Sequence, residues 1–482
     1  MAHVVVVGGG FAGLGAALTL SRRGHAVTVM ERDPTPLPAT ADEAFAWDRR
    51  GAPQVRHSHA FLARLRNLLR DRHPDVLAAL LEAGASELRF GDDLAPTITN
   101  YVREPGDDDL VILACRRTTF EWVLRRTVTA EGRVEIITGS AVTGLVAAPT
   151  DGAPTVTGVT LDNGTSLAAD IVVVASGRRS TLPDWLSAIG VMTLPEEVED
   201  TGIVYCSRFY RLRPGQAPPR RGGVIGGDLG YLKFGVFVGD NATFSVTLAV
   251  PTDDAELRAL LTRPEAFEQA ASLLPATAAW IEVERAEAIT PVHRMAGLVN
   301  RLRTFVVDGE PIAIGVHPVG DALLCTNPLY GRGCATGFWS AALLDEAIAA
   351  HAGDARAQAL AYHDAVRTEI EPWYRSSVNQ DAEARRVAAA LLAGEDPEDG
   401  DDPRAFMRSV FREGLVPALR RDAIVLRAFV RNLNLLTPPD ALIRDADVGA
   451  RVLAVWQERD QREPEKPLGP KTRAELVAAI TA

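Results

Sequence analysis

Cysteine is scarce in this 482-residue chain, which contains only Cys115, Cys206, Cys325 and Cys334. No two of them form a CxxC or CxxxC pair, and none lies in a histidine-rich neighbourhood. A disulfide framework and a structural zinc site are therefore not expected. The absence of both features favours a reducing compartment, and we expect a cytoplasmic protein.

Long apolar runs are also missing. No stretch reaches the roughly 18 residues that a membrane-spanning helix requires, so no transmembrane segment is expected. The sequence MAHVVVVGGGFAG has no basic region before its short apolar run and continues directly into a glycine-rich turn, which predicts a buried strand rather than a signal peptide. The formal charge of -12 is spread along the chain, so nucleic acid is not an expected partner.

Signatures of two common kinds of active site are absent as well. Ser176 and Ser340 are not part of a GxSxG sequence, so neither is expected to be the nucleophile of a hydrolase. His57 and His59 form a His-x-His pair without a third histidine or a carboxylate in the neighbouring sequence, and no metal site is expected there.

What is present begins with a dinucleotide-binding pattern. An apolar strand over residues 3–7 leads into a GxGxxG turn and then a helix. The glycines allow a tight turn, close approach of a pyrophosphate, and close packing of the helix on the strand. An acidic residue at the end of the following strand is placed to accept hydrogen bonds from ribose hydroxyls. The cofactor-binding residues expected here are Gly8, Gly10, Phe11, Ala12, Gly13, Glu31 and Arg32.

The remaining patterns predict an α/β protein with a discontinuous organisation. We expect a nucleotide-binding domain formed by residues 1–182 and 291–350. Residues 183–290 contain alternating strands such as TGIVYCSRFYRL and YLKFGVFV, which predict an antiparallel sheet domain for the substrate. Residues 351–482 are predominantly helical.

Three segments together resemble the class A flavoprotein monooxygenases, the type of para-hydroxybenzoate hydroxylase and squalene epoxidase. They are the N-terminal fingerprint, DIVVVASGRRS and VGDALLCTNPLYGRGCATG. RRGAPQVRHSH, DTGIVYCSRFYRL, NPLYGRG and the helical tail are similar in particular to the flavin epoxidases of polyether antibiotic biosynthesis. The resemblance implies FAD, bound in a Rossmann-like domain of the glutathione-reductase type.

The resemblance also implies roles for residues outside the fingerprint. Asp321 would hold the ribityl or pyrophosphate side of FAD, and Arg117 would contact its phosphates or ribityl chain. The backbone at Ala141 and Val142 would meet the adenine.

A second group of implied residues surrounds the flavin ring. Gly331 and Gly333 would present backbone N–H groups at the start of a helix, where they stabilise negative charge on reduced flavin. Pro328 would lie against the ring. Cys334 follows at the same helix start, where its thiol is either activated by a lowered pKa or simply small enough for close packing.

The segment RRGAPQVRHSH concentrates Arg49, Arg50, Arg56, His57 and His59 before an apolar helix. This density of cations predicts contact with an anion or with flavin, and Arg56 and His57 are the candidates nearest the ring. The alternative is a solvated loop whose histidines cap local backbone groups.

Two departures restrict the assignment. Ser176-Gly177 stands where many class A hydroxylases have Asp-Gly, which puts a direct NADPH contact there in doubt. The chain also lacks the Trp-x-Trp pair of flavin halogenases, and no lysine precedes Lys233, whereas a halogenase is expected to have both.

The function implied is that of an FAD-dependent monooxygenase, an epoxidase or hydroxylase. It would transfer oxygen from a flavin 4a-hydroperoxide to a hydrophobic, olefinic or aromatic secondary metabolite. The expected partners are this small molecule, molecular oxygen, and NAD(P)H or a partner flavin reductase as the source of electrons. Two alternatives remain open: a reductase or dehydrogenase of a lipid-like substrate, similar to geranylgeranyl reductases, and a non-catalytic FAD-binding scaffold.

Two further patterns leave a choice to the structure. Aromatic residues alternate along the expected sheet, so most belong to its core while some face the substrate cavity; they are Phe209, Tyr210, Tyr231, Phe234, Phe237 and Phe244. The sequence RRDAIVLRAFVRNLNLL predicts an amphipathic helix that packs on its own protein, with a membrane surface as the alternative.

Overall fold

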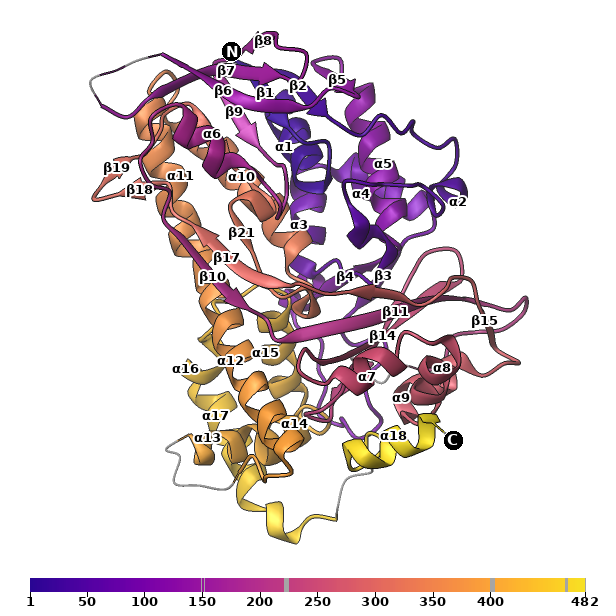
Figure 1. Cartoon of the computed structure of the whole chain (residues 1–482). Coiled ribbons are helices and arrows are strands. Elements are labelled where there is room, and N and C mark those ends of the chain that lie inside the picture. Colours follow the sequence, from indigo (N-terminus) through magenta and orange to yellow (C-terminus); the bar gives the residue numbers. More distant parts are fainter. Residues whose placement is uncertain (149, 151, 221–224, 399–403, 464–466, 482) are drawn as a thin grey trace.

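The computed structural model describes residues 1–148, 150, 152–220, 225–398, 404–463 and 467–481. Its N-terminal unit is built on a parallel sheet with the strand order β20-β9-β1-β2-β5 (Figure 1). The strands are β1 His3–Val7, β2 Ala26–Glu31, β5 Val134–Thr138, β9 Ile171–Val174 and β20 Val316–Pro318. Branched apolar side chains dominate β1 and β9 because both faces of these strands are covered. The expected α/β fold with a Rossmann-type unit is confirmed.

Different layers cover the two faces of this sheet. On one face α1 (Phe11–Arg22) packs between the strands and α10 (Gly333–Ala350), and Gly15 of α1 leaves room for the ring of Phe338. The opposite face packs against a three-stranded antiparallel sheet, β6 (Val142–Ala148), β7 (Thr155–Leu161) and β8 (Ser166–Ala168), and against α6 (Leu182–Ala188). The unit therefore has three layers, with separate apolar cores on the two sides of the parallel sheet.

Further helices complete the α1 side of this unit. The segment between β2 and β5 contributes α3 (Ala63–Arg72), α4 (Pro74–Glu82) and α5 (Arg117–Ala130). The same segment contains β4 (Val111–Ala114), which pairs antiparallel with β3 (Ser86–Arg89) and is not part of the parallel sheet. The long helix α11 (Ala355–Glu369) packs on α10.

The expected antiparallel sheet is present and crosses the lower half of the molecule in Figure 1. Its strand order is β12-β13-β14-β11-β15, and β16 also pairs with β11. The bounds are β11 Ile203–Leu212, β12 Gly226–Asp228, β13 Lys233–Val238, β14 Thr243–Pro251, β15 Ala286–Ala288 and β16 His293–Met295. The same stretch also contains helices that the alternating pattern did not indicate: α7 Ala255–Leu260, α8 Pro264–Ser272 and α9 Pro275–Ile281.

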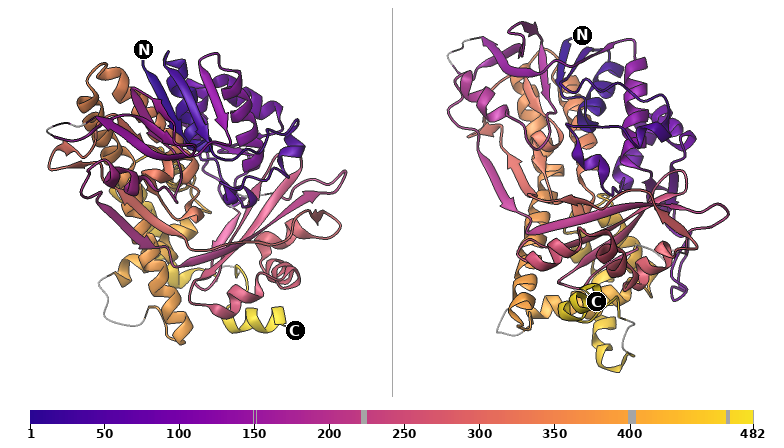
Figure 2. Two further views of the ribbon diagram at one scale, coloured as in Figure 1. Left: turned by 45° about the horizontal axis from the view of Figure 1, so that its top comes forward. Right: turned by 45° about the vertical axis from the view of Figure 1, so that its right-hand side comes forward.

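These helices, together with the C-terminal α18 (Arg473–Thr481), cover one face of the antiparallel sheet. That face carries Tyr210, Phe234 and Phe244, which are buried in an apolar core with Trp280. The two chain termini lie at opposite ends of the molecule (Figure 2).

Two strands connect the units. β10 (Glu196–Asp200) runs from the parallel-sheet unit to the antiparallel sheet, and β17 (Val299–Arg303) returns. They pair antiparallel with each other along their whole length, and β21 (Leu324–Cys325) adds to β17. A short hairpin, β18 (Val306–Val307) and β19 (Glu310–Pro311), follows.

The C-terminal region is helical, as expected. Besides α11 and α18, its described part contains α12 Glu371–Ala393, which is the longest, α13 Ala405–Ser409, α14 Val416–Ala418, α15 Ala423–Leu433, α16 Ala441–Arg444 and α17 Ala446–Gln457. A π-helical turn, Val410–Leu415, joins α13 to α14. The amphipathic helix α15 packs within the protein, since the buried Arg427 binds Asp107 at 2.7 Å. No helix in the described part of the chain is long and apolar enough to cross a membrane.

Candidate functional site

The GxGxxG turn lies between β1 and α1, with a different geometry at each glycine. Gly8 has φ +108°, and a Cβ there would lie 2.6 Å from the carbonyl oxygen of Ala175. A Cβ at Gly13 would overlap the carbonyl oxygen of Gly8. At Gly10, by contrast, a Cβ would meet no atom within 4 Å. The turn therefore leaves an open space at the glycine where a pyrophosphate approaches such a motif.

Glu31 ends β2 beside this turn and is buried. Its Oε2 accepts a hydrogen bond from the backbone N–H of Gly9 at 2.9 Å, and its Oε1 accepts one from Asp33 at 2.9 Å. Arg32, the next residue along the chain, is exposed. The structure thus brings Glu31 to the turn but leaves Arg32 at the surface.

A cluster of buried charges surrounds Glu31. Arg49 lies 3.5 Å from Glu31, 3.8 Å from Asp33 and 3.5 Å from Glu121. Three buried polar atoms in this cluster have no hydrogen-bond partner: Arg49 Nε, Asp33 Oδ2 and Glu121 Oε2. Buried polar groups are normally satisfied, so these atoms fit a polar ligand beside the glycine turn, and the pyrophosphate and ribose of FAD have suitable groups.

Arg117 connects this cluster to the start of α10. Its Nε donates to Glu121 Oε1 and its Nη1 to the sulfur of Cys334, at 2.7 and 2.6 Å, and its guanidinium lies over the ring of Phe11 at 4.3 Å. Burial raises the pKa of the Cys334 thiol to about 11 even though Arg117 opposes the shift. The structural alternative for Cys334 is therefore favoured over an activated thiol.

Asp321 lies in a short 3-10 turn, Gly320–Ala322, after β20. Burial raises the pKa of its carboxyl, although Arg117 and Arg178 oppose this shift. The carboxylate accepts no hydrogen bond within the described part of the chain, which fits a residue whose partner is a hydroxyl-bearing ligand.

The segment after Asp321 forms the expected glycine-rich start of α10. Gly331 has φ +68°, a left-handed conformation that favours glycine. Gly333 begins the helix, and a Cβ there would meet no atom within 4 Å. Pro328 is exposed in the preceding turn, Pro328–Tyr330. These residues leave space in front of the helix N-terminus, as the close approach of a flavin ring requires.

Residues Ala141 and Val142 lie where the chain enters β6. The turn before them is beside β2, because the N–H of Gly139 donates to the carbonyl oxygen of Glu31 at 2.8 Å. This position is compatible with the implied adenine contact, which stays a prediction.

The cationic segment is divided by the structure. Arg49 is buried, while Arg50 and Arg56 are exposed and pair with Asp48. The implied flavin contact of Arg56 stays a prediction, and its guanidinium is engaged at the surface. His57 is buried: its Nδ1 lies 3.3 Å from Ser207 Oγ.

The two histidines of this segment, His57 and His59, are neutral near pH 7 because their pKa values are lowered. Burial lowers the pKa of His57 to about 3 and that of His59 to about 3. His59 Nδ1 lies 3.0 Å from the carbonyl oxygen of His57, so the capping alternative describes it well. The described residues contain no group of three or more metal-ligating side chains.

The antiparallel sheet meets this segment with its second face. Thr247 Oγ1 lies 2.9 Å from Ser207 Oγ and 2.7 Å from Ser58 Oγ, and the Ser58 hydroxyl also lies 2.7 Å from that of Ser245. Phe209 projects from this face against the ring of Phe45, at a centroid distance of 5.5 Å. Of the alternating aromatic residues, Phe209 and Phe237 therefore share the face that is turned towards the parallel-sheet unit.

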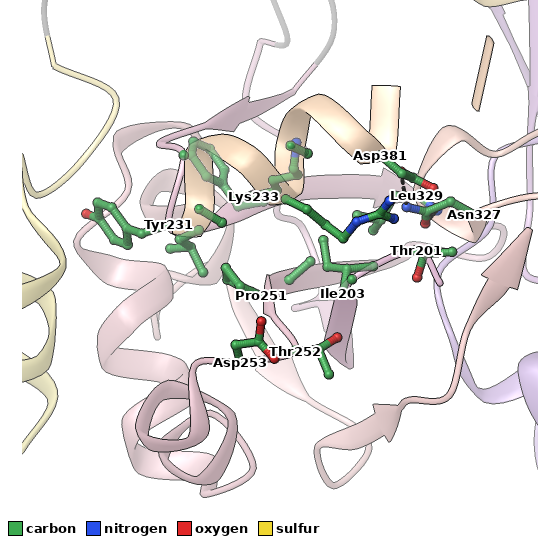
Figure 3. A pocket seen from close by; sticks show the side chains of 18 of the residues that line it. Thr201, Ile203, Tyr231, Lys233, Pro251, Thr252, Asp253, Asn327, Leu329 and Asp381 are labelled. Atoms are coloured by element: carbon green, nitrogen blue, oxygen red, sulfur yellow. Dashed lines mark hydrogen bonds between the residues drawn. The ribbon is translucent and has the colours of Figure 1, made fainter. Parts of the chain in front are cut away.

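A cavity of about 320 Å³ lies along this face, between the sheet and α12. Apolar residues provide much of its lining, including Ile203, Phe237, Ala249, Leu329 and Leu392. Figure 3 shows Asn327, Leu329 and Asp381 together at one end of the cavity and Tyr231 at the other. Asn327 and Leu329 belong to the segment NPLYGRG, which the resemblance implies lies against the flavin ring.

Asp381 of α12 holds that segment in place. Its buried carboxylate accepts hydrogen bonds from Asn300 Nδ2 at 2.7 Å, Asn327 Nδ2 at 2.8 Å and the Tyr330 hydroxyl at 2.6 Å. Sequence reasoning did not select Asp381, because it lies in an ordinary helical pattern far from the motifs. Glu121 was missed as well, although its i,i+4 spacing from Arg117 was visible.

Comparisons with known proteins agree with this geometry. A family model described as FAD dependent oxidoreductase matches residues 3–78, the part of the chain that contains the glycine turn and Glu31. The protein Rv3254 of Mycobacterium tuberculosis is 32% identical over an alignment of 357 residues, and the match covers 69% of this chain and 69% of that protein.

Two solved structures are similar in fold. A probable FAD-dependent monooxygenase from Pseudomonas aeruginosa, PqsL, has a TM-score of 0.54 and 18% identity over 81% of this chain and 96% of its own. The anhydrotetracycline hydroxylase OxyS from Streptomyces rimosus has a TM-score of 0.53 and 19% identity over 90% of this chain and 76% of its own. At these identities the likeness concerns the fold.

Proposed function

Because the chain belongs to the family of the Mycobacterium tuberculosis protein Rv3254 and is an FAD-dependent oxidoreductase, we propose that it is a monooxygenase. It inserts one atom of molecular oxygen into a hydrophobic, olefinic or aromatic small molecule. The observation that carries the proposal is the cavity between the antiparallel sheet and α12. Asn327 and Leu329, at one end of this cavity, belong to the segment NPLYGRG, which the resemblance implies contacts the flavin.

The described residues divide the work between holding the cofactor and holding the substrate. The open space at Gly10 and the unsatisfied atoms around Arg49 would hold the pyrophosphate and ribose of FAD. The carboxylate of Asp321 would hold its ribityl or pyrophosphate side. The backbone N–H of Gly333 would stabilise negative charge on the ring. The N–H of Gly331 was expected to do the same, but it donates to the carbonyl oxygen of Pro328 at 2.9 Å, which closes the preceding turn. Bound FAD supplies the reduction of oxygen, which no side chain can perform.

The cavity suits a reaction from which water is excluded. Its apolar lining holds a greasy ligand next to the flavin-contacting segment and limits the access of water. No general base is required for epoxidation. His57 and His59, whose pKa values burial lowers to about 3, are too weakly basic to act as one. The resemblance of NPLYGRG and RRGAPQVRHSH to polyether epoxidases supports a flavin monooxygenase and leaves both epoxidation and hydroxylation as candidate reactions.

Electrons come from NAD(P)H that visits transiently or from a partner flavin reductase. The sequence contains no second GxGxxG turn after a strand, and Ser176 replaces the aspartate associated with NADPH contact. If the purified enzyme oxidises NADPH without any reductase, NADPH is the direct electron donor. If activity appears only when a flavin reductase is added, the reductase supplies the electrons.

Labelled dioxygen tests the proposal. Enzyme reduced without air is mixed with ¹⁸O₂ and a panel of hydrophobic olefins and aromatic compounds, and products are analysed by mass spectrometry. We expect one labelled oxygen atom in at least one product. The matched control is Ala384→Trp, which fills the cavity: it should retain FAD and still consume oxygen to form hydrogen peroxide, but make no labelled product.

The reductase of a lipid-like substrate is the alternative that the same experiment separates. If oxygen yields only hydrogen peroxide with every compound, and the same compounds are reduced or desaturated without oxygen, the monooxygenase proposal is wrong and the reductase takes its place.

A further inference from the structure

The charged side chains of the substrate cavity are paired within the protein or exposed to solvent at its rim, with one exception. Lys233 Nζ binds Asp228 at 2.5 Å. The Asp381 carboxylate has three hydrogen-bond donors. The carboxylates of Asp200 and Asp253 are exposed at the rim. Arg385 alone has no carboxylate within ion-pair distance in the described part of the chain, and its Nη1 donates only to the backbone carbonyl oxygen of Asp200.

Arg385 is held in the cavity wall by its surroundings. It lies on α12 one turn after Asp381 and one turn before Ala388, and all three residues line the cavity. Gly202, at the junction of β10 and β11, has φ +69°, and a Cβ there would lie 2.6 Å from Cδ of Arg385. The left-handed glycine thus makes room for the arginine stem. The guanidinium is anchored at both its stem and its Nη1.

A half-buried guanidinium retains most of its donors for a ligand. Arginine has five N–H donors in a planar fork that matches a carboxylate, and only one donor bonds the backbone here. Leaving a partly buried cation without a counter-ion is unfavourable. Lys233, the other cation of the described lining, is paired with Asp228, so Arg385 is the cationic position open to a ligand.

We propose that Arg385 binds an oxyanion of the substrate, and that the substrate is a hydrophobic molecule with one carboxylate or similarly acidic oxygen at one end. The apolar body of the substrate lies along Ile203, Phe237 and Ala249. This inference rests on the proposed function in taking the cavity as the substrate cavity, but it concerns binding and does not require oxygen transfer.

Arg385 and Asp381 set the polarity of the cavity together. The charge of Arg385 lowers the pKa of the Asp381 carboxyl, against the rise that burial causes. The ionised Asp381 carboxylate can only accept hydrogen bonds, and Asn300, Asn327 and Tyr330 already donate to it. The guanidinium is therefore the ligand-binding half of the two, and Asp381 is the half that positions the flavin-contacting segment.

Calorimetric titration of the FAD-loaded enzyme with two matched probes tests the inference. The probes are 2-naphthoate and 2-naphthylmethanol, which share an aromatic skeleton and differ in the oxyanion. We expect the wild type to bind 2-naphthoate at least tenfold more tightly, as a charge-assisted hydrogen bond provides. Arg385→Gln should lose this preference while binding 2-naphthylmethanol as before, and Arg385→Lys should retain part of it.

Two control variants locate the effect. Arg386 is the next residue of α12, but it pairs with Glu383 at 2.7 Å and does not line the cavity. Arg386→Gln removes the same charge and should keep the preference for 2-naphthoate. Ala384→Trp should weaken the binding of both probes, because its side chain fills the cavity.

The inference is overturned if the wild type binds the two probes equally, or if it shows no saturable binding of 2-naphthoate. It is also overturned if Arg385→Gln keeps the preference or if Ala384→Trp leaves both affinities unchanged. If Arg385→Gln does not retain FAD, the comparison of Arg385→Lys with Arg386→Gln decides instead. The assignment is refuted if Arg385→Lys binds 2-naphthoate with an unchanged preference while Arg386→Gln loses that preference. Failure of the monooxygenase proposal would appear instead in the ¹⁸O₂ experiment, with these affinities intact.

Discussion

Gly10→Ala separates cofactor binding from folding, because this glycine has space around it that the other two lack. Its backbone, φ -83° and ψ -172°, is accessible to alanine. The added methyl group would meet no atom within 4 Å. Gly10 also caps α1, where alanine is less favourable than glycine by roughly 0.5–1 kcal/mol, but glycine costs about 0.4–1 kcal/mol of chain entropy on folding.

These two contributions have opposite signs, so the free energy of unfolding of the FAD-free protein should change by no more than about 0.5 kcal/mol. FAD binding should change much more. The methyl group occupies the space through which a pyrophosphate reaches the backbone N–H groups. Loss of one or two such bonds, each worth about 1–3 kcal/mol to a charged group, predicts an affinity at least tenfold lower.

The assay is a titration of apoprotein with FAD, followed by flavin fluorescence, beside urea unfolding of the same apoprotein. Gly13→Ala is the matched control, since its Cβ would overlap the carbonyl oxygen of Gly8. Such overpacking should lower the free energy of unfolding by about 1–3 kcal/mol as well as weaken FAD binding. Wild-type FAD affinity in Gly10→Ala, with normal stability, would mean that the cofactor binds elsewhere and would refute the reasoning.

Three other predictions concern the cofactor, pH and the contact between the units. Asp321→Ala should weaken FAD binding by about 1–3 kcal/mol through loss of hydrogen bonds, and denatured wild-type protein should release all its flavin on filtration; flavin that stays on the unfolded chain would contradict noncovalent binding. Because burial lowers the pKa of His57 to about 3, the unfolded chain gains a proton near pH 6.5 that the native protein does not bind, so the free energy of unfolding should fall as the pH falls from about 6.5 towards 3. His57→Gln should reduce this slope in urea titrations at several pH values, and an unchanged slope would argue against a neutral buried His57. Arg116 and Asp240 form a buried ion pair between the units at 2.6 Å, so Arg116→Gln should cost about 3–5 kcal/mol in urea unfolding, and a change below about 1 kcal/mol would show that the pair contributes little.

The parts of the site that depend on local structure could be predicted from the sequence. The strand, turn and helix around Gly8, Gly10 and Gly13 were predicted correctly, because each glycine acts within a few residues of its own position. The alternating patterns of β11, β13 and β14 likewise predicted antiparallel strands, since a side-chain period of two is visible in the sequence.

What sequence reasoning missed depends on contacts between distant segments. Asp240 is buried only because Arg116, 124 residues earlier, pairs with it. Asp381 accepts a hydrogen bond from Asn300, which is 81 residues away in the chain. The sequence around such residues does not indicate that they are buried. An acidic side chain on an amphipathic helix is predicted to be solvent-exposed unless the position of its partner is known. Arg385 was missed for the same reason, because its position depends on Gly202 of another element.

The order of strands in the parallel sheet has a consequence for synthesis of the chain. β9, at Ile171–Val174, pairs with β1 on one edge and with β20, at Val316–Pro318, on the other. About 140 residues separate β9 from β20 along the chain. A ribosome that adds about 5–20 residues per second therefore leaves the β20 edge of β9 unpaired for roughly 7–28 seconds. α10, which packs on α1, emerges later still. The strands of the antiparallel sheet, which end at Met295, are synthesised before β20, and we expect them to pair before the nascent nucleotide-binding unit can close over its own core.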